Sequence, residues 1–599
     1  MPNFRKHPCR IVLGLGLMLA IGLAVRAQDG ILKQEAERVA VVEKVKPSVV
    51  AIFAPGGRGG GSGVLISDDG FALTNFHVVQ GSGPLMECGL PDGVLYHGVL
   101  IGLDKVGDVA LIKLLPKKDG QKFPFAPLGD SDKVHEGDWS LAMGNPFLLA
   151  TDFTPTVTFG LVSGVHRYQY PAGELLEYTD CIQIDTSINP GNSGGPLFNM
   201  KGELIGINGR GSFDKRGRVN SGVGYAISIN QIKNFMGHLR AGIDSDHATL
   251  GALVTTQTEK TGIGRSIVTS ILEESDVFRR GLDIDDELLS FAGRHISSVN
   301  HFKNVLGLYP RGWRVPVEFR REQKRSEVLV RLMGKQRKVL EDPDAKPPPK
   351  LPPVKIVKGP PSPAAKYYQP KPGFSNFYFN KLEQDRLLAA FHKHGDFSSL
   401  GGKWTIDGGV RLKKLTSQSK AHIEIGEEKS KDDKSSKPVV KMTVGDFPYT
   451  LEPLNQGDPA VLRLPEGSGG LLAALYVYRQ FLLGDGKGFS EFAHGGCEPF
   501  YPPPASGKTP ASLGDLRVET EVINSRLGPF LTKWFFSRAD SKLLGFELRL
   551  QENEDPCEVY LSDYRPVDGR LLPHKMQVQY GNFHYGTFNL TSFKLAAAK

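Results

Sequence analysis

Apolar residues between positions 48 and 228 fall in short runs separated by turns that contain glycine. Val49-Val50-Ala51-Ile52 and Asp108-Val109-Ala110-Leu111-Ile112 are typical of these runs. Short β-rich runs at regular spacing predict an all-β barrel or sandwich. The next stretch, Ile229 to Leu239, carries apolar residues at helical spacing, and Gly242 follows as a stop signal.

The rest of the chain divides by pattern into a mixed module, a spacer and a final module. Mixed strands and one helix are predicted from Thr249 to Leu332. The 30 residues from Pro343 to Pro372 hold 11 prolines, which predicts a polyproline-type spacer. In the final module, Leu471 to Leu483 predicts one apolar helix. Its closing residues alternate around Met576 and Val578, which predicts an antiparallel sheet with one buried face. Together with these closing strands, its aromatic opening at Phe374, Phe377, Tyr378 and Phe379 suggests a curved sheet that packs on the helix.

The N-terminus has the three parts of a secretory signal. Arg5, Lys6 and Arg10 precede an apolar run from Ile11 to Val25, and Val25-Arg26-Ala27 places a small residue at the expected cut site. We expect an exported protein, periplasmic or secreted, with an uncleaved anchor as the alternative. Cleavage after residue 27 removes four basic residues and no acidic one, which lowers the formal charge from +8 to +4. So small a charge makes nucleic acid an unlikely partner.

Three residues carry candidate chemistry: His77, Asp108 and Ser193. His77 is predicted at the end of an apolar strand, and Asp108 directly before a buried one. Taken alone, the first could be a core histidine and the second a turn residue. Ser193 lies in Asn189-Pro190-Gly191-Asn192-Ser193-Gly194-Gly195-Pro196-Leu197. A serine hydroxyl needs a base to become a nucleophile, and the oxyanion that it creates needs preorganised donors. The glycines permit backbone conformations that aim N–H groups at one point. The predicted oxyanion hole comprises Gly191, Asn192 and Ser193.

These segments resemble trypsin-like serine proteases of the HtrA (DegP-like) type. The resemblance covers about Val49 to Gly242 and rests on several motifs in the same order. They are Gly61-Ser62-Gly63-Val64, Thr74-Asn75-Phe76-His77-Val78-Val79, Asp108-Val109-Ala110-Leu111, Gly144-Asn145-Pro146-Phe147, Gly191-Asn192-Ser193-Gly194-Gly195-Pro196-Leu197 and Gly222-Val223-Gly224-Tyr225-Ala226-Ile227. The order His, Asp, Ser along the chain is that of the chymotrypsin-like barrel.

The resemblance implies two six-stranded β-barrels with the site in the cleft between them. Ser193 is then the nucleophile, His77 the base and Asp108 the acid that orients it; Asp104 and Asp185 are rival acids. The implied S1 pocket comprises Ile188, Gly222, Val223, Gly224, Tyr225 and Ala226. Because no acidic residue stands where trypsin needs one, and because the family prefers small aliphatic side chains, we expect cleavage after residues such as Val, Ala or Ile.

The module from Thr249 to Leu332 resembles the PDZ domain that follows the protease in HtrA proteins. The implied peptide-binding loop comprises Thr249, Leu250, Gly251 and Ala252. A partner's C-terminus would add as a strand beside Leu250 to Val254, facing a helix at Val299 to Leu306. The sequence departs from the family at Asp285-Asp286, where Gly-Asp is usual, which puts the turn in doubt. The alternative is a small α+β domain that binds nothing.

The predicted fold is multidomain: an all-β double-barrel protease domain, an α+β PDZ domain, a Pro-rich linker and a mainly antiparallel β (α+β) C-terminal domain. The predicted boundaries are 1–27 for the signal peptide, 28–46 for an N-terminal helix, 47–243 for the protease domain, 249–334 for the PDZ domain, 342–373 for the linker and 374–599 for the C-terminal domain. The last is faintly similar to periplasmic lipoprotein-carrier domains.

The predicted function is that of an exported serine endopeptidase that cleaves unfolded or misfolded proteins. The alternative is a chaperone or peptide-binding scaffold in the cell envelope. We expect no cofactor and no metal, since the chain has no His-Glu-x-x-His and no Cys-x-x-Cys. Family resemblance adds a homotrimer as an expectation. Cys497 and Cys557 could pair in an oxidising compartment, and Cys88 and Cys181 could pair or remain buried thiols.

Overall fold

The computed structural model describes residues 31–54, 60–145, 152–172, 176–189, 191–213, 220–258, 264–334, 362–413, 418–429, 436–452, 458–504 and 510–598. The predicted signal peptide and most of the predicted linker lie outside these residues. Contacts divide the chain into two compact units. The first comprises Met1–Gly98, Lys113–Val165 and Ile182–Ile229; the second comprises Val99–Ile112, His166–Cys181 and Asn230–Lys599.

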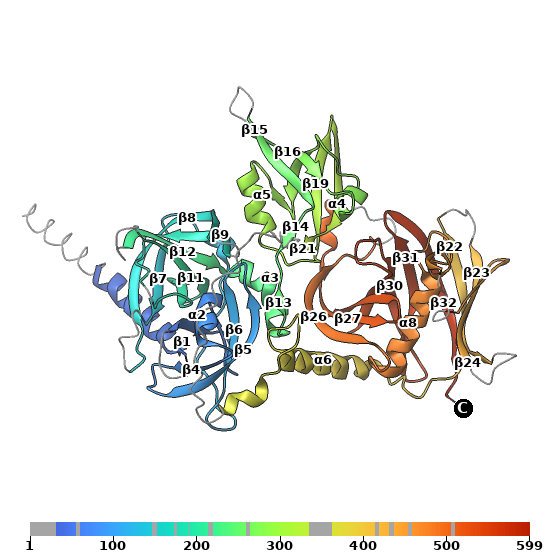
Figure 1. The fold of residues 1–599 in the computed structure, drawn as a ribbon, viewed down its shortest axis with the longest axis horizontal. Coiled ribbons are helices and arrows are strands. Elements are labelled where there is room, and N and C mark those ends of the chain that lie inside the picture. The colour runs from blue at the N-terminus through green and yellow to red at the C-terminus, as the bar shows by residue number, and fades with distance from the viewer. Residues whose placement is uncertain are drawn as a thin grey trace, which may run out of the picture. The chain divides into compact units, whose positions relative to one another are not determined.

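Two closed sheets form the N-terminal part of the fold (Figure 1). The first runs in the order β13-β5-β4-β1-β2-β3-β6, and an added β5–β6 pairing closes six of its strands into a ring. Its strands are β1 (Val49–Phe53), β2 (Gly60–Leu65), β3 (Phe71–Thr74), β4 (Leu85–Gly89), β5 (Leu95–Asp104), β6 (Val109–Leu114) and β13 (Asp244–Ser245). The prediction of an all-β double barrel is confirmed by this ring and by a second, closed six-stranded barrel.

The second barrel has the strand order β10-β11-β12-β9-β8-β7. Its strands are β7 (Trp139–Gly144), β8 (Thr156–Ala172), β9 (Leu176–Ile184), β10 (Pro196–Asn199), β11 (Leu204–Phe213) and β12 (Asn220–Ser228). Apolar side chains such as Ile184, Leu197 and Ala226 fill its core. The predicted helix after this barrel is α3 (Ile229–Arg240), and Gly242 ends it with a φ of +63°, a backbone that favours glycine.

Shorter helices complete this part of the chain. Residues 31–45 are helical and are followed by η1 (Lys46–Ser48). Helix α2 (Phe76–Ser82) follows β3 directly, and η2 (Ser131–Lys133) precedes β7. None of the helices in the described ranges is both long and apolar enough to cross a membrane.

The middle module, residues 249–334, is a small α+β unit. Its sheet has the order β15-β16-β17-β19-β20, with β18 on β17, and β14 pairs separately with β21. The elements are β14 (Ala248–Thr249), β15 (Ala252–Thr258), β16 (Gly264–Ile271), α4 (Asp276–Arg279), β17 (Glu287–Phe291), β18 (Arg294–His295), α5 (Val299–Leu306), β19 (Arg314–Arg321), β20 (Lys324–Arg331) and β21 (Met333–Gly334). Ser298 caps α5 by accepting a hydrogen bond from the His301 N–H. The helix has the bounds that the sequence predicted.

The C-terminal module, residues 374–599, is built on one eleven-stranded antiparallel sheet. Its order is β25-β24-β23-β22-β32-β31-β30-β29-β28-β27-β26. The strands are β22 (Trp404–Leu412), β23 (Ser419–Lys429), β24 (Ser436–Val444), β25 (Phe447–Leu451), β26 (Glu491–Phe500), β27 (Val518–Leu527), β28 (Phe530–Ser537), β29 (Leu543–Arg549), β30 (Cys557–Val567), β31 (Arg570–Tyr580) and β32 (Phe583–Leu595). The helices are η4 (Pro363–Tyr367), just before the module, then α6 (Phe377–Phe391), η5 (His392–His394), α7 (Pro459–Leu462), α8 (Leu471–Gly484) and η6 (Leu513–Leu516).

The predicted sheet and helix of this module are confirmed. Met576, Val578 and Phe588 are buried on one face, as the alternation predicted. Helix α8 packs against β23 to β25 and also against β29 and β30 (Figure 1).

The aromatic opening of the C-terminal module forms a helix, so its expected place in the sheet was wrong. The Asn376 side chain accepts a hydrogen bond from the Tyr378 N–H and caps α6. The helix buries Phe379, Leu387 and Phe391, which are spaced for a helix rather than a strand.

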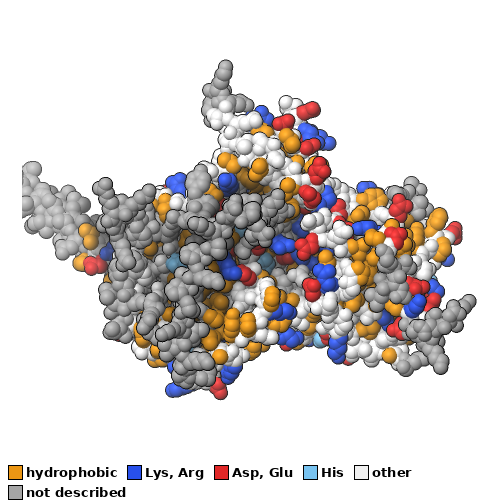
Figure 2. All heavy atoms as spheres, in the orientation of Figure 1, with side chains coloured by type: hydrophobic (Ala, Val, Ile, Leu, Met, Phe, Trp, Pro, Cys, Tyr) orange, Lys and Arg blue, Asp and Glu red, His pale blue; other side chains and the backbone are white. Residues whose placement is uncertain are grey.

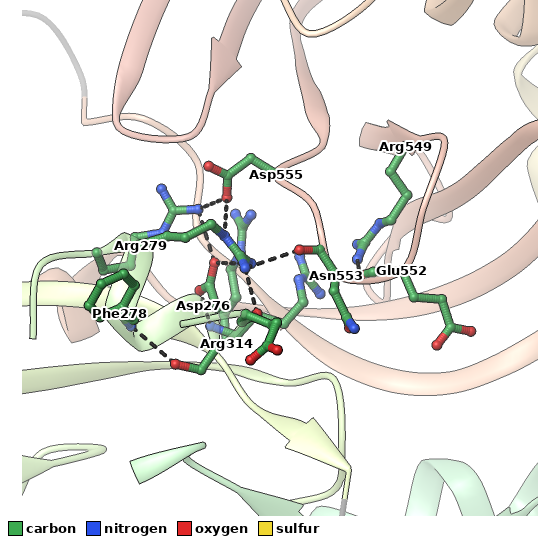
Figure 3. Close-up of polar contacts among 12 residues, drawn as sticks. Asp276, Phe278, Arg279, Arg314, Arg549, Glu552, Asn553 and Asp555 are labelled. Atoms are coloured by element: carbon green, nitrogen blue, oxygen red, sulfur yellow. Dashed lines mark hydrogen bonds and ion pairs between the residues drawn. The ribbon is translucent and has the colours of Figure 1, made fainter. Parts of the chain in front are cut away.

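Within the second unit, the middle and C-terminal modules are joined by buried ion pairs. Arg314 of β19 contacts Glu558 of β30, and Arg331 of β20 donates to Glu547 of β29 at 2.5 Å. Figure 3 shows the neighbouring contacts, in which the Arg279 guanidinium donates to Asp555 at 3.2 Å. On the molecular face in Figure 2, acidic and basic side chains are interspersed.

Candidate active site

His77 lies in the first turn of α2, not at the end of a strand as the sequence suggested. Strand β3 ends at Thr74, and the buried Asn75 takes an extended backbone at the helix N-cap. The helix turns its apolar residues Val78 and Val79 inward and leaves the His77 side chain exposed. The imidazole is therefore presented to solvent by a short, well-packed helix.

The Ser193 loop has the backbone that the glycine pattern predicted. Gly191 has a φ of +103° and Gly194 a φ of +83°, a region that side chains with a Cβ rarely adopt. A Cβ on Gly194 would lie 2.3 Å from the Ser62 carbonyl oxygen and 3.0 Å from the Asn75 nitrogen. The serine loop thus packs closely against the residues that lead into His77.

The backbone N–H groups of this loop are not equivalent. The Asn192 N–H donates to the Asn189 carbonyl at 2.9 Å, and the Gly194 N–H to the Asn208 carbonyl at 2.8 Å. Among the described residues, no acceptor is recorded for the N–H groups of Gly191 and Ser193. The Asn192 N–H, one of the three predicted oxyanion donors, is thus engaged within the loop.

Ser62 supports the serine loop, a role that its motif Gly61-Ser62-Gly63-Val64 did not predict. Its hydroxyl donates to the Gly191 carbonyl at 2.7 Å and accepts from the Asn145 N–H at 2.9 Å. Its own N–H donates to the Ser193 carbonyl at 2.9 Å. The glycines on either side of Ser62 were the sequence signal for this close contact, because a Cβ on Gly61 would lie 2.9 Å from the Ser193 carbonyl oxygen.

Asp108 belongs to the second compact unit. It is fully buried, with a φ of +57° in the turn before β6, a conformation that Asp tolerates better than most residues. The Tyr178 hydroxyl donates to its Oδ2 at 2.5 Å. The carboxylate is therefore held inside the protein by a tyrosine that no sequence motif pointed to.

The two rival acids have other partners. Asp104 accepts the Gly107 N–H at 2.8 Å and pairs with the buried His247, whose Nε2 lies 2.8 Å from Oδ1. Asp185 accepts the Leu161 N–H at 2.6 Å. Both carboxylates are thus engaged in holding the barrel backbone.

Five of the six residues predicted to line an S1 pocket lie on β12, and the sixth, Ile188, lies in the loop after β9 and approaches this strand at Gly224. Strand β12 pairs with β9 at Gly224 and Ile184. A Cβ on Gly224 would lie 2.8 Å from Ile188 Cγ1, whereas one on Gly222 would meet nothing within 4 Å. Of the remaining predicted residues, Ala226 is buried, and Val223 and Tyr225 are half-buried. The Ile188 side chain therefore makes this corner apolar.

In the middle module, the predicted peptide-binding loop leads into a sheet edge. Strand β15 begins at Ala252 and is the end strand of its sheet. Leu250 is buried, and Gly251 has a φ of +78°. Helix α5 is tied to β15 where the Val299 N–H donates to Thr256 Oγ1 at 2.8 Å. An edge strand beside a helix is the geometry to which an extended peptide adds.

The expected disturbance at Asp285 is not found. This residue takes a φ of +69°, the backbone that a glycine would take. Its N–H donates to the Val268 carbonyl at 2.9 Å, and the Val268 N–H donates to the Asp286 carbonyl at 2.9 Å. Asp is among the few residues that enter the left-handed region readily, so the turn is kept.

The four described cysteines are free, so the suggested pairings are not formed. Cys88, Cys181 and Cys557 are buried, and burial raises the pKa of Cys497 to about 12. Within the described ranges, no three His, Cys, Asp or Glu side chains gather as metal ligands would.

The barrel part of the chain is similar in sequence to known proteins. The trypsin-like peptidase domain family matches residues 61–207. A Chlamydia trachomatis protein named "Probable periplasmic serine endoprotease DegP-like" is 34% identical over 284 residues, which are 45% of this chain and 53% of that protein. A Marinomonas protein of the same name is 34% identical over 279 residues, 45% of this chain and 56% of its own.

Among solved structures, the HtrA-type protease AlgW with a tripeptide is similar, at 28% identity over 52% of this chain and 98% of that one, with a TM-score of 0.40. The chain spans about half the length of the curated relatives that it matches. Residues 61–207 are a trypsin-like peptidase domain. This part of the chain is similar to HtrA-type serine proteases, and the relatives given above are named as serine endoproteases.

Proposed function

We propose that this chain is an exported serine endopeptidase that cleaves unfolded or misfolded proteins. The observation that carries the proposal is the Ser193 loop, where two glycines with positive φ pack a serine against the residues that lead into His77. Export is supported by the N-terminal signal pattern and by the periplasmic location in the names of the relatives.

In the proposed mechanism, Ser193 attacks the peptide carbonyl while His77 accepts its proton and later gives it to the leaving amine. Asp108 orients the imidazole and stabilises it when charged. The N–H groups of Gly191 and Ser193 bind the oxyanion, and loss of one such donor typically costs about 3–4 kcal/mol of transition-state stabilisation.

Substrate choice follows from the apolar corner at Ile188 and Gly224. An apolar and uncharged surface at this position favours Val, Ala or Ile at the cleavage site over Lys or Arg. Profiling with a peptide library tests this preference, and a profile dominated by basic residues would contradict it.

The middle module is proposed to bind the C-termini of partner peptides as a PDZ domain. Support comes from the edge strand β15, the turn at Gly251 and the neighbouring α5. Fluorescence polarisation with a labelled peptide ending in a free carboxylate should show saturable binding. The same peptide with an amidated C-terminus should bind at least tenfold more weakly, and equal binding would count against the PDZ assignment.

Self-association, with a trimer as the expected state, is supported by an apolar surface of the first unit. Ile31, Leu32 and Val39 of the N-terminal helix are more than half exposed. Nearby, the Arg38 guanidinium lies 4.8 Å from the Phe159 ring centroid, and that ring stacks on the exposed Trp139 at 4.5 Å. Light scattering of the purified protein and of a Trp139→Lys variant tests whether this surface is buried between copies.

The protease proposal is tested with unfolded casein and a serine-directed fluorophosphonate label mapped by mass spectrometry. Wild-type protein should hydrolyse casein and take the label on Ser193, and Ser193→Ala should do neither. Ser67→Ala is the matched control, since its hydroxyl bonds to Asp69 and not to the site. Hydrolysis that survives in Ser193→Ala overturns the proposal, and equal suppression of casein aggregation by both forms points to a chaperone instead.

A further inference from the structure

We propose that Tyr178 is a positioning residue that holds the Asp108 carboxylate in the orientation in which it serves His77. This inference rests on the proposed function, in which Asp108 is the acid of the triad. Tyr178 is not part of any motif, and it is 70 residues from Asp108 along the chain.

The contact joins two buried groups. The Tyr178 hydroxyl donates to Asp108 Oδ2 at 2.5 Å, and the residues are 4% and 0% exposed. A buried carboxylate requires hydrogen-bond donors to remain ionised. A hydrogen bond to a charged acceptor is also stronger than one between neutral groups. The tyrosine is therefore part of what holds this carboxylate in place.

The backbone that carries Tyr178 is itself tied to the turn that carries Asp108. The N–H of Glu177, the preceding residue on β9, donates to the Val106 carbonyl at 2.9 Å. The start of the same turn is held by Asp104, which accepts the Gly107 N–H and pairs with the buried His247. The donor and the acceptor thus stand on segments that cannot easily shift apart.

The backbone of the turn does not by itself set the rotation of the Asp108 carboxylate. Asp108 lies outside the strand, with a φ of +57°, and the terminal torsion of an aspartate is broad. A donor fixed on Oδ2 sets the rotation of the group and hence the direction of Oδ1. Orientation is the contribution of the acid in a triad, since it selects the productive imidazole tautomer.

The test is Tyr178→Phe, which removes one oxygen and keeps the buried ring. We expect kcat on unfolded casein to fall about tenfold while KM stays within a factor of two, because the change removes a hydrogen bond to a charged group. The acidic limb of kcat/KM should move to higher pH, because a carboxylate without this donor stabilises the imidazolium more strongly. A thermal melt and the near-UV circular dichroism spectrum verify folding.

Tyr168→Phe is the matched control. Its hydroxyl donates to Glu177 Oε1 at 2.8 Å in the same β8–β9 hairpin, so its loss should leave kcat and the pH profile unchanged. In an Asp108→Asn background, Tyr178→Phe should reduce the residual kcat by less than a factor of two, because the tyrosine acts through the carboxylate.

The outcomes separate the two proposals. If wild-type protein neither hydrolyses casein nor takes the label, the proposed function fails and this inference falls with it. If wild-type is active, Ser193→Ala is inactive, Asp108→Asn keeps only a low residual kcat, and folded Tyr178→Phe matches wild-type in kcat and pH profile, only the role of Tyr178 is overturned. A full tenfold loss in the Asp108→Asn background also overturns it.

Discussion

Arg314 on β19 donates to both carboxylate oxygens of Glu558 on β30, and the two side chains are only 14% and 6% exposed. Burial alone would lower the pKa of Arg314, but Glu558 and Glu547 hold it well above its usual value. The pair links the middle module to the C-terminal sheet at a distance of 244 residues along the chain.

Removing one charge of this pair should destabilise the second unit strongly. Glu558→Gln leaves the buried Arg314 guanidinium without the negative charge of its main partner. Breaking a buried ion pair in this way lowers the free energy of unfolding by about 3–5 kcal/mol. Urea denaturation followed by tryptophan fluorescence measures the change. Asp563→Asn, which breaks an exposed pair with Arg565, is the control and should leave the midpoint unchanged. A Glu558→Gln midpoint equal to wild-type would contradict the prediction.

Cutting the chain in the Pro-rich segment should not release the C-terminal module. A specific cleavage site inserted between Lys350 and Leu351 produces two fragments, which we expect to co-elute in gel filtration at physiological salt. Buried ion pairs and the hydrogen bond from Trp313 Nε1 to the Cys497 carbonyl, at 2.9 Å, hold them together. Separate elution without denaturant would show that these contacts are too weak to do so.

Acid should destabilise the protein through His238 of α3. Burial, with a smaller contribution from Lys533, lowers its pKa to about 4. The folded state thus favours the neutral imidazole. The contribution of His238 to the free energy of unfolding is therefore complete above pH 6.5 and is lost as the pH falls from about 6.5 to about 4. The loss amounts to about 3 kcal/mol.

The measurement is the urea midpoint as a function of pH. His238→Gln cannot gain a proton, so its stability should vary less between pH 6.5 and 4 than that of wild-type protein. His135→Gln, at an exposed position, should follow the wild-type curve. Identical curves for wild-type and His238→Gln would exclude this source of acid sensitivity.

A methyl group on Gly194 should abolish hydrolysis. The residue has a φ of +83°, and its Cβ would lie 2.3 Å from the Thr74 Oγ1 and the Ser62 carbonyl oxygen. We expect Gly194→Ala to lose at least a hundredfold in kcat/KM on casein. Gly81→Ala is the control, because its Cβ meets nothing within 4 Å on the same α2 that carries His77. Activity of Gly194→Ala near that of the control would mean that the loop is not held as described.

Much of the fold was predictable because its signals are local. Alternating apolar residues around Met576 place one face of β31 in the core, and the spacing in Ile229 to Leu239 defines α3. The stretch that opens the C-terminal module was misinterpreted because aromatic residues suit both strands and helices. The N-cap at Asn376 and the burial of Leu387 decided for the helix.

The residues of the candidate site also fall into two groups: those that the sequence indicates and those that only the structure shows. His77, Asp108 and Ser193 stand in motifs whose glycines and apolar flanks can be recognised without coordinates. The sequence could not single out Ser62 and Tyr178 as site residues, because it does not show which distant oxygen a hydroxyl group contacts. The contact between Asp104 and the buried His247 was likewise not predictable from the sequence.

The sequence by itself determined the order of the strands and helices, the glycines at turns that need a positive φ, and the residues that carry the candidate chemistry. All of these depend on neighbours a few positions away. Only the tertiary structure decided which tyrosine holds Asp108, which carboxylate His247 engages, and that the middle and C-terminal modules share buried ion pairs. Those partners lie 70, 143 and 244 residues apart, and such pairings are set by how whole sheets pack rather than by local preference.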